Sequence, residues 1–238
     1  MINHLEIGSI AVQLNRKPIK HLHISVLPPD GRVRVSAPVS MSDTAIRMAV
    51  INRLAWIKMQ QRDFAQQPRQ SSREMVSGEC HYLWGKPYRL DVKEVAGKHR
   101  VEVGRDRLRL LINPSTSFEN KARVLDAFYR EALKTRVDTL LPDWLKQIDV
   151  SIAAVGVKKM KTKWGSCNIQ ACRIWLNLEL AKKPPECLEY ILVHELIHLH
   201  ERHHNDRFKA LMDRHLPDWR ERRSLLNSRP LAYNHWEY

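Results

Sequence analysis

The chain has 238 residues, of which 43% are hydrophobic and 28% are charged, values that are typical of a folded globular protein and exclude an intrinsically disordered one. Its formal net charge of +14 favours anionic partners such as nucleic acid, nucleotides or acidic proteins. No apolar stretch is long enough to cross a membrane, and residues 1–10 lack the basic and apolar regions of a signal peptide. We therefore expect a cytoplasmic protein with no membrane segment.

The first forty residues are predicted to form strands. Apolar residues alternate at 10–14, 21–27 and 33–35, which predicts antiparallel strands, the last two of them joined by a hairpin at 28–31. The pattern then becomes helical. Ser42 is a candidate N-cap for a helix of about twenty residues, because apolar residues recur after it at helical spacing.

This predicted helix ends near Phe64 and is followed by a polar loop at residues 66–72. Glycines then separate four short apolar segments, which predict a second meander of strands. These strands are expected at residues 82–84, 88–95, 99–103 and 108–112.

The chain becomes more helical after Ser117, where we place a boundary between a β-rich region with one long helix, residues 1–117, and a second region, residues 118–238. A helix is predicted from Ser117 to about Leu141, with Pro142 ending it. The predicted elements that follow are a strand at residues 150–160, a turn at 164–168, a strand at 173–178, and helices that open at Pro184 and Asn205. The expected fold class is α+β, with the β-rich half packed on a compact core.

The strongest motif of the chain is a pair of histidines, His194 and His198, with Glu195 directly after the first. Histidines four residues apart lie on the same face of a helix, one turn apart, where both imidazoles can bind one zinc ion. The glutamate is placed to accept a proton from a water that the zinc activates. The sequence therefore predicts a zinc hydrolase with Glu195 as the general base.

An ordinary amphipathic helix is the competing interpretation of this motif. The flanking residues are apolar, so the polar trio would interrupt an almost continuous apolar surface, and burying such groups without a partner is costly. A metal ion supplies that partner. A catalytic zinc needs a third protein ligand, and His203 and His204 both follow where the helix can end. The gap to His204 equals the metzincin spacing, but Glu201 stands where that motif needs glycine.

Several motifs together resemble the YgjP-like metallopeptidases, which are related to the SprT and Spartan proteases. They are the run Trp164-Gly165-Ser166-Cys167, then Asn177, the histidine motif with Leu199, and the run from His204 to Phe208, with further similarity at Trp56-Ile57, Gly78-Glu79, Tyr82-Leu83 and Gly85. The resemblance covers nearly the whole chain. It implies a compact zincin core behind a β-rich half.

The resemblance also implies site residues. His204, in a His-x-x-x-Phe pattern, would be the third zinc ligand beside His194 and His198, although His203 replaces the asparagine often found before it. Trp164, Gly165 and Ser166 would lie beside the metal and contact the substrate, because glycine allows the backbone to approach it closely. A plain hairpin turn with a core tryptophan is an equally good interpretation of these three residues.

Three functions are compatible with these residues. The first is a peptidase that binds its substrate along a strand near Trp164 and hydrolyses the peptide bond. The second is a nucleoside triphosphate (for example UTP) pyrophosphatase, an activity also linked to the family, in which Lys161, Lys163 or Arg173 would hold phosphates. The third is a nucleic-acid-binding protein with a structural zinc, which Glu195 argues against because a structural site needs no base.

The four cysteines are too few for a disulfide framework in a chain of this length, so we expect reduced thiols. Cys167 and Cys172 have no second close pair, which disfavours a zinc site made of cysteines.

Overall fold

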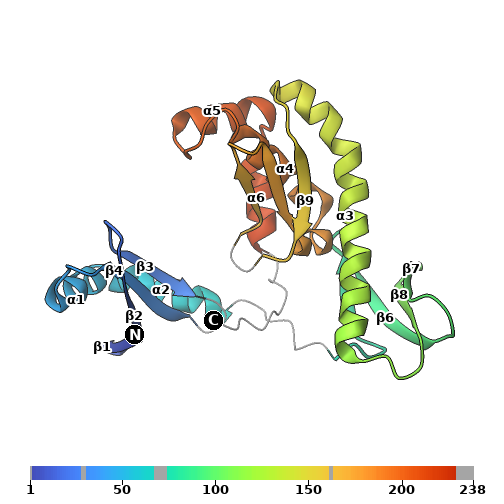
Figure 1. Ribbon diagram of the computed structural model, residues 1–238, viewed down its shortest axis with the longest axis horizontal. Coiled ribbons are helices and arrows are strands. Elements are labelled where there is room, and N and C mark those ends of the chain that lie inside the picture. The colour runs from blue at the N-terminus through green and yellow to red at the C-terminus, as the bar shows by residue number, and fades with distance from the viewer. Residues whose placement is uncertain (1, 28–30, 67–73, 161–162, 229–238) are drawn as a thin grey trace. The chain divides into compact units, whose positions relative to one another are not determined.

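The computed structural model describes residues 2–27, 31–66, 74–160 and 163–228. These residues form a mixed α+β structure with six α-helices, one short 3-10 helix and three small sheets (Figure 1). The chain divides into two compact units between Arg69 and Gln70, which lie outside the described residues. Each unit has a hydrophobic core of its own.

The first unit is a four-stranded sheet with two helices packed on its apolar side chains. The sheet order is β1-β2-β4-β3, and Val12, Leu14, Val33 and Val35 alternate into the core. Its elements are β1 (Ile2–Ile7), β2 (Ile10–Lys17), β3 (His23–Leu27), β4 (Arg32–Pro38), α1 (Asp43–Ile51) and α2 (Leu54–Gln66).

Several predictions for this unit need correction. β3 and β4 are antiparallel as expected, but β2 pairs with β4 in parallel, and β1 was not predicted. Ser42 is the predicted N-cap, and its hydroxyl accepts a hydrogen bond from the N–H of Ala45. The single predicted helix is two helices that separate at Asn52 and Arg53. The predicted loop lies mostly outside the described residues.

The second unit begins with another four-stranded sheet, of order β5-β6-β8-β7. Its strands are β5 (Cys80–Leu83), β6 (Lys86–Glu94), β7 (Arg100–Val103) and β8 (Arg107–Ile112). β6 and β8 pair in parallel, so the predicted meander is wrong, although all four strands were expected near these positions. Leu90, Leu108 and Leu110 of this sheet share one core with the helices that follow. The compact units therefore divide well before Ser117, where the sequence pattern changes.

The long helix α3 (Phe118–Ile148) runs from this sheet to the region of β9 and α4 (Figure 1). Ser117 is its N-cap, as predicted, but the helix continues through Pro142 instead of ending there. Pro142 lies on the exposed side of the helix. Because proline has no N–H, the carbonyl four residues before it loses its helical hydrogen bond, but on this side it can bind water instead. Trp144 and Ile148 are buried in the core, and this packing holds the last two turns.

The rest of the second unit is a three-stranded sheet with helices against it. Its elements are β9 (Ala154–Lys158), β10 (Gly165–Asn168), β11 (Arg173–Asn177), the 3-10 helix η1 (Leu178–Lys182), α4 (Pro185–Ile197), α5 (Asp206–His215) and α6 (Trp219–Ser228). The sheet order is β10-β11-β9, so β10 is an edge strand among the described residues. Residues 165–168 were expected in a turn, but they form β10 because they pair with β11. Helix α6 was not predicted.

None of the helices that the structure describes has the length and hydropathy needed to cross a bilayer.

Candidate metal centre and active site

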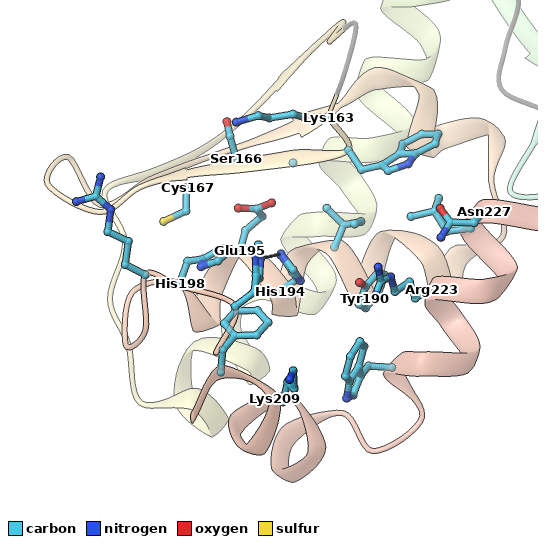
Figure 2. Close-up of a pocket in the computed structure, with 18 of the residues that line it drawn as sticks. Lys163, Ser166, Cys167, Tyr190, His194, Glu195, His198, Lys209, Arg223 and Asn227 are labelled. Carbon is cyan, nitrogen blue, oxygen red and sulfur yellow. Dashed lines mark hydrogen bonds between the residues drawn. The ribbon is translucent and has the colours of Figure 1, made fainter. Parts of the chain in front are cut away.

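Helix α4 fixes the positions of the histidine motif because it is buried on nearly every side. Leu188, Leu192 and Leu196 have no exposed surface, so the helix cannot rotate without exposing apolar groups. His194 and Glu195 lie in its last turn and His198 is its C-cap residue. Figure 2 shows these three side chains at one cavity.

His204 joins this pair from the loop between α4 and α5. The side chain of Asn205 caps α5 by accepting a hydrogen bond from the N–H of Phe208 at 3.0 Å, which sets the position of the preceding histidine. The Nε2 atoms of His204 and His194 lie 3.0 Å apart. The potential ligand atoms of His194, His198 and His204 all lie within 4.8 Å of one another, and in the described part of the chain His203 is not part of the group.

Two further contacts hold the imidazoles in place. The ring of Phe208, which is 3% exposed, packs against all three histidine rings at centroid distances of 4.8–4.9 Å. Nδ1 of His198 lies 3.0 Å from the carbonyl oxygen of Glu201. If this nitrogen carries the proton and donates to that oxygen, the other nitrogen, Nε2, keeps its lone pair for a metal.

The electrostatics of the group favour neutral imidazoles. Burial, together with the neighbouring charges of His198, His204 and Arg223, lowers the pKa of His194 to about 3. Burial also lowers the pKa of His198. Both rings are therefore in the uncharged form that binds metal ions at neutral pH.

The carboxylate of Glu195 lies between α4 and the edge strand β10. It is 5% exposed, and the backbone N–H of Cys167 donates a hydrogen bond to it. Burial raises the pKa of Glu195 to about 7, while the charge of Lys163 and the hydrogen bond from Cys167 act in the opposite direction. A carboxyl group with a pKa near neutrality can both accept and donate a proton.

Gly165 allows β10 to come this close to the glutamate. A Cβ atom added at Gly165 would lie 2.5 Å from Oε1 of Glu195 and 2.8 Å from Cγ2 of Ile191. The glycine was predicted to permit a close approach to the substrate, and in the structure it permits the close packing of β10 on α4.

A cavity of about 790 Å³ lies beside the histidines, with β10 along one side and α4, α5 and α6 along the others. Four cationic side chains line it, and Glu195 is the only carboxylate among the described residues that do so. The cations are Lys163, Arg202, Lys209 and Arg223.

The three residues predicted to contact the substrate all line this cavity. Trp164 also packs under the ammonium group of Lys183, which lies 5.3 Å from the ring centroid. The side chain of Ser166 points to the opposite side of β10 from that of Cys167, which faces Glu195 (Figure 2). The four cysteines are free thiols.

Sequence reasoning missed the part of the cavity that α6 provides. Tyr190, Trp219 and Arg223 line it beyond the histidines, and none was singled out. Tyr190 lies four residues before His194 on α4, so its place on the metal-facing side could have been inferred from helical spacing. Trp219 and Arg223 could not be assigned to the cavity from the sequence, because α6 itself was not predicted.

The donor set fits a metal ion. Ligand nitrogens about 2.0–2.1 Å from a tetrahedral zinc lie about 3.3 Å from one another. The ligand atoms of the three histidines lie within 4.8 Å of one another, two of them only 3.0 Å apart, with a buried carboxylate next to them.

Comparison with known proteins agrees with this geometry. Residues 20–229 match the family described as YgjP-like, metallopeptidase domain. The chain belongs to the YgjP-like metallopeptidase family. Membership implies a metal-dependent hydrolase, and the three-histidine group is where this YgjP-like chain can hold the ion.

Among solved structures, the crystal structure of the metallopeptidase zymogen of Pyrococcus abyssi abylysin is similar to part of the chain. The two share 19% identity with a TM-score of 0.34, over 40% of this chain and 99% of that one. No curated protein matches the chain.

Proposed function

We propose that the chain is a zinc-dependent peptidase in which His194, His198 and His204 hold the ion and Glu195 is the general base. The observation that carries the proposal is the combination of three clustered imidazoles with a buried carboxylate at the side of one cavity. Three neutral nitrogen ligands and an open fourth position are typical of catalytic zinc.

Zinc, when bound, supplies an acidified water and polarises the substrate carbonyl. Glu195 would accept a proton from the attacking water on its carboxylate and would later deliver it to the nitrogen of the departing amine. The N–H of Cys167 orients the carboxylate, and the charge of Lys163 favours its ionised form. A pKa near 7 suits this double role, because the group must gain and lose a proton in each turnover.

The edge strand β10 supports binding of an extended peptide. The N–H of Asn177 donates to the carbonyl of Trp164 across the antiparallel pair of β10 and β11. Because hydrogen-bonding direction alternates along a strand, Gly165 and Cys167 direct their backbone groups away from β11. The N–H of Cys167 is taken by Glu195, which leaves the carbonyl of Cys167 and the backbone groups of Gly165 as partners for a substrate strand.

The Glu195→Gln variant tests the proposal. We expect it to bind zinc as the wild-type chain does and to hydrolyse unfolded casein about 10²- to 10⁴-fold more slowly, because the amide cannot accept the proton. Glu186→Gln, an exposed residue in the first turn of the same helix, is the matched control and should keep full activity. Unchanged turnover of the Glu195 variant would rule out the proposed role.

A second candidate, hydrolysis of nucleoside triphosphates, is favoured by the cationic lining of the cavity. Of the residues considered for holding phosphates, Lys163 lines the cavity and Arg173 does not, while Lys161 lies outside the described residues. Incubating the zinc-loaded protein with each nucleotide and assaying for released pyrophosphate distinguishes this activity from peptide cleavage.

A further inference from the structure

The cavity extends past the three histidines to one face of α6. Trp219, Arg223 and Asn227 follow one another at intervals of four residues, so they lie on the same face of this helix, and all three line the cavity. Tyr190 connects this face to the metal centre. Its ring stacks on Trp219 at a centroid distance of 6.4 Å and meets His194 edge-on at 5.9 Å. An aromatic surface thus leads from the histidines to α6.

Arg223 is the arginine of α6 that has no ion pair among the described residues. Arg220 pairs with Asp213, and Arg222 pairs with Glu189 and Asp218. Arg223 instead lies beside Tyr190 at the cavity (Figure 2).

The chemistry of this face suits a carboxylate. A guanidinium presents a planar fork of N–H donors that matches the two oxygens of a carboxylate, and Asn227, one helical turn further on, adds an amide donor. Lys209, also at the cavity, already pairs with Asp206 at 2.9 Å. Glu195, the other charged group near Tyr190, belongs to the proposed catalytic machinery.

We propose that Arg223 and Asn227 form a subsite that binds a carboxylate of the peptide substrate. This inference rests on the proposed peptidase function. Tyr190 lies between the two sites, because its ring meets His194 at 5.9 Å and stacks on Trp219 of α6 at 6.4 Å. The carboxylate therefore belongs to the part of the peptide that extends from the scissile bond along this aromatic surface, either as an acidic side chain or as the C-terminal carboxylate.

Peptide libraries with matched charges test the subsite on the zinc-loaded full chain. One library of eight-residue peptides is made with a free C-terminal acid and again with a C-terminal amide, and a second contains glutamate or glutamine at each position. We expect the wild type to prefer the peptides that carry the carboxylate. The comparison of the two libraries shows whether it comes from a side chain or from the terminus.

Variants of Arg223 assign the preference to this residue. Arg223→Gln should lower kcat/KM for the preferred peptides by about 10- to 100-fold, mainly through KM, and leave kcat/KM for the neutral analogues within about twofold. Arg223→Lys should recover only part of the preference, because a lysine lacks the fork of donors. Arg214→Gln on α5 removes the same charge outside the cavity and should change neither class of peptide.

A binding measurement separates failure of the subsite from failure of the peptidase proposal. Calorimetry with N-benzoylglycine and with its amide measures carboxylate binding to the zinc-loaded protein without any cleavage. The acid should bind at least tenfold more tightly than the amide. Arg223→Gln should abolish this difference in affinity. Cleavage of peptides with no preference for carboxylates would overturn the subsite. So would a preference and a binding difference that both survive in Arg223→Gln. Arg223-dependent binding of the acid with no peptide cleaved would instead uphold the subsite and overturn the peptidase function.

Discussion

At the scale of single residues, the site depends on how closely β10 packs against α4. Gly165 lies directly over the carboxylate that we propose as the general base, and it leaves no room for a side chain. Polar groups in a cavity of this kind act only when they are held in a fixed geometry, and a displacement of about 1 Å can lower a rate about 10²-fold. The glycine is therefore a requirement of the site geometry.

The Gly165→Ala variant is expected to lose about 10²-fold in kcat while it keeps its zinc. The added Cβ would lie 2.5 Å from Oε1 of Glu195, so either the carboxylate or the strand must move. Peptidase assays and zinc content measure the two effects separately. Gly104→Ala is the control, because its Cβ would meet only the carbonyl oxygen of Arg107 at 3.3 Å, and it should stay close to wild type. A fully active Gly165 variant would show that the close packing is unimportant.

The adjacent histidines 203 and 204 offer a second test. His204→Ala removes a nitrogen from the three-histidine group and should weaken zinc binding at least tenfold. His203→Ala changes an exposed neighbour outside that group and should leave zinc affinity unchanged. Titration against a chromophoric chelator gives both affinities. Weaker binding in the His203 variant alone would move the third ligand to that residue.

At the scale of secondary-structure elements, Asn177 holds the segment that leads into β10. Its side chain is buried, its amide donates to the carbonyls of Met160 at 2.9 Å and Lys163 at 2.8 Å, and its oxygen accepts from the N–H of Glu179 at 3.2 Å. One side chain thus ties the end of β11 and the start of η1 to the residues before Trp164. The position of the edge strand beside Glu195 follows from these bonds.

Replacing Asn177 with aspartate is expected to lower the free energy of unfolding by about 2–4 kcal/mol. The carboxylate would face the two carbonyl oxygens that the amide now satisfies, and it cannot donate to them. Denaturant unfolding measures the loss. Asn168→Asp is the matched control, because within the described part of the chain that side chain bonds only through its oxygen, which accepts from the N–H of Ala171, so a change below about 0.5 kcal/mol is expected. Equal effects of the two substitutions would contradict the role given to Asn177.

The elements show which features the sequence could predict. The metal-binding residues lie on α4 and before α5, and local signals fixed both helices: prolines at the start of one and Asn205 at the cap of the other. Pairing of strands was not predictable, because the same alternation fits parallel and antiparallel neighbours, as in β2 with β4 and β6 with β8. α3 passes Pro142 because tertiary burial of Trp144 and Ile148 outweighs a local break signal.

The cavity face of α6 was missed for a related reason. This helix is rich in arginine and has few apolar residues, so its sequence gives only a weak signal for a helix packed in the core. Trp219 and Leu226 are nevertheless buried there, and polar contacts with other helices add to this packing. Arg222 bonds to Glu189 of α4, which also accepts from the indole of Trp144 on α3 at 3.1 Å. Long-range ion pairs of this kind leave no periodic pattern in the sequence.

At the scale of the whole molecule, every residue of the proposed site belongs to the second unit. Among the residues that the structure describes, the two hydrophobic cores share no buried residue, and the one in the second unit combines β5 to β8 with α3, α4, α5 and α6. A unit with its own core can in principle fold alone. A division at residue 117, as the change in sequence pattern suggested, would instead separate Leu90, Leu108 and Leu110 from the helices against which they pack.

We therefore expect a fragment of residues 70–238 to fold alone and to bind zinc within about threefold of the affinity of the full chain. Circular dichroism during denaturant unfolding should show one cooperative transition, and zinc at 100 times its Kd should stabilise the fragment by about 2.7 kcal/mol. A fragment of residues 118–238 is the control. It lacks the strands that complete the core, so it should unfold at lower denaturant or aggregate. If the shorter fragment proved as stable as the longer one, the second sheet would not be part of the catalytic unit, and the division between units would have to move to residue 117.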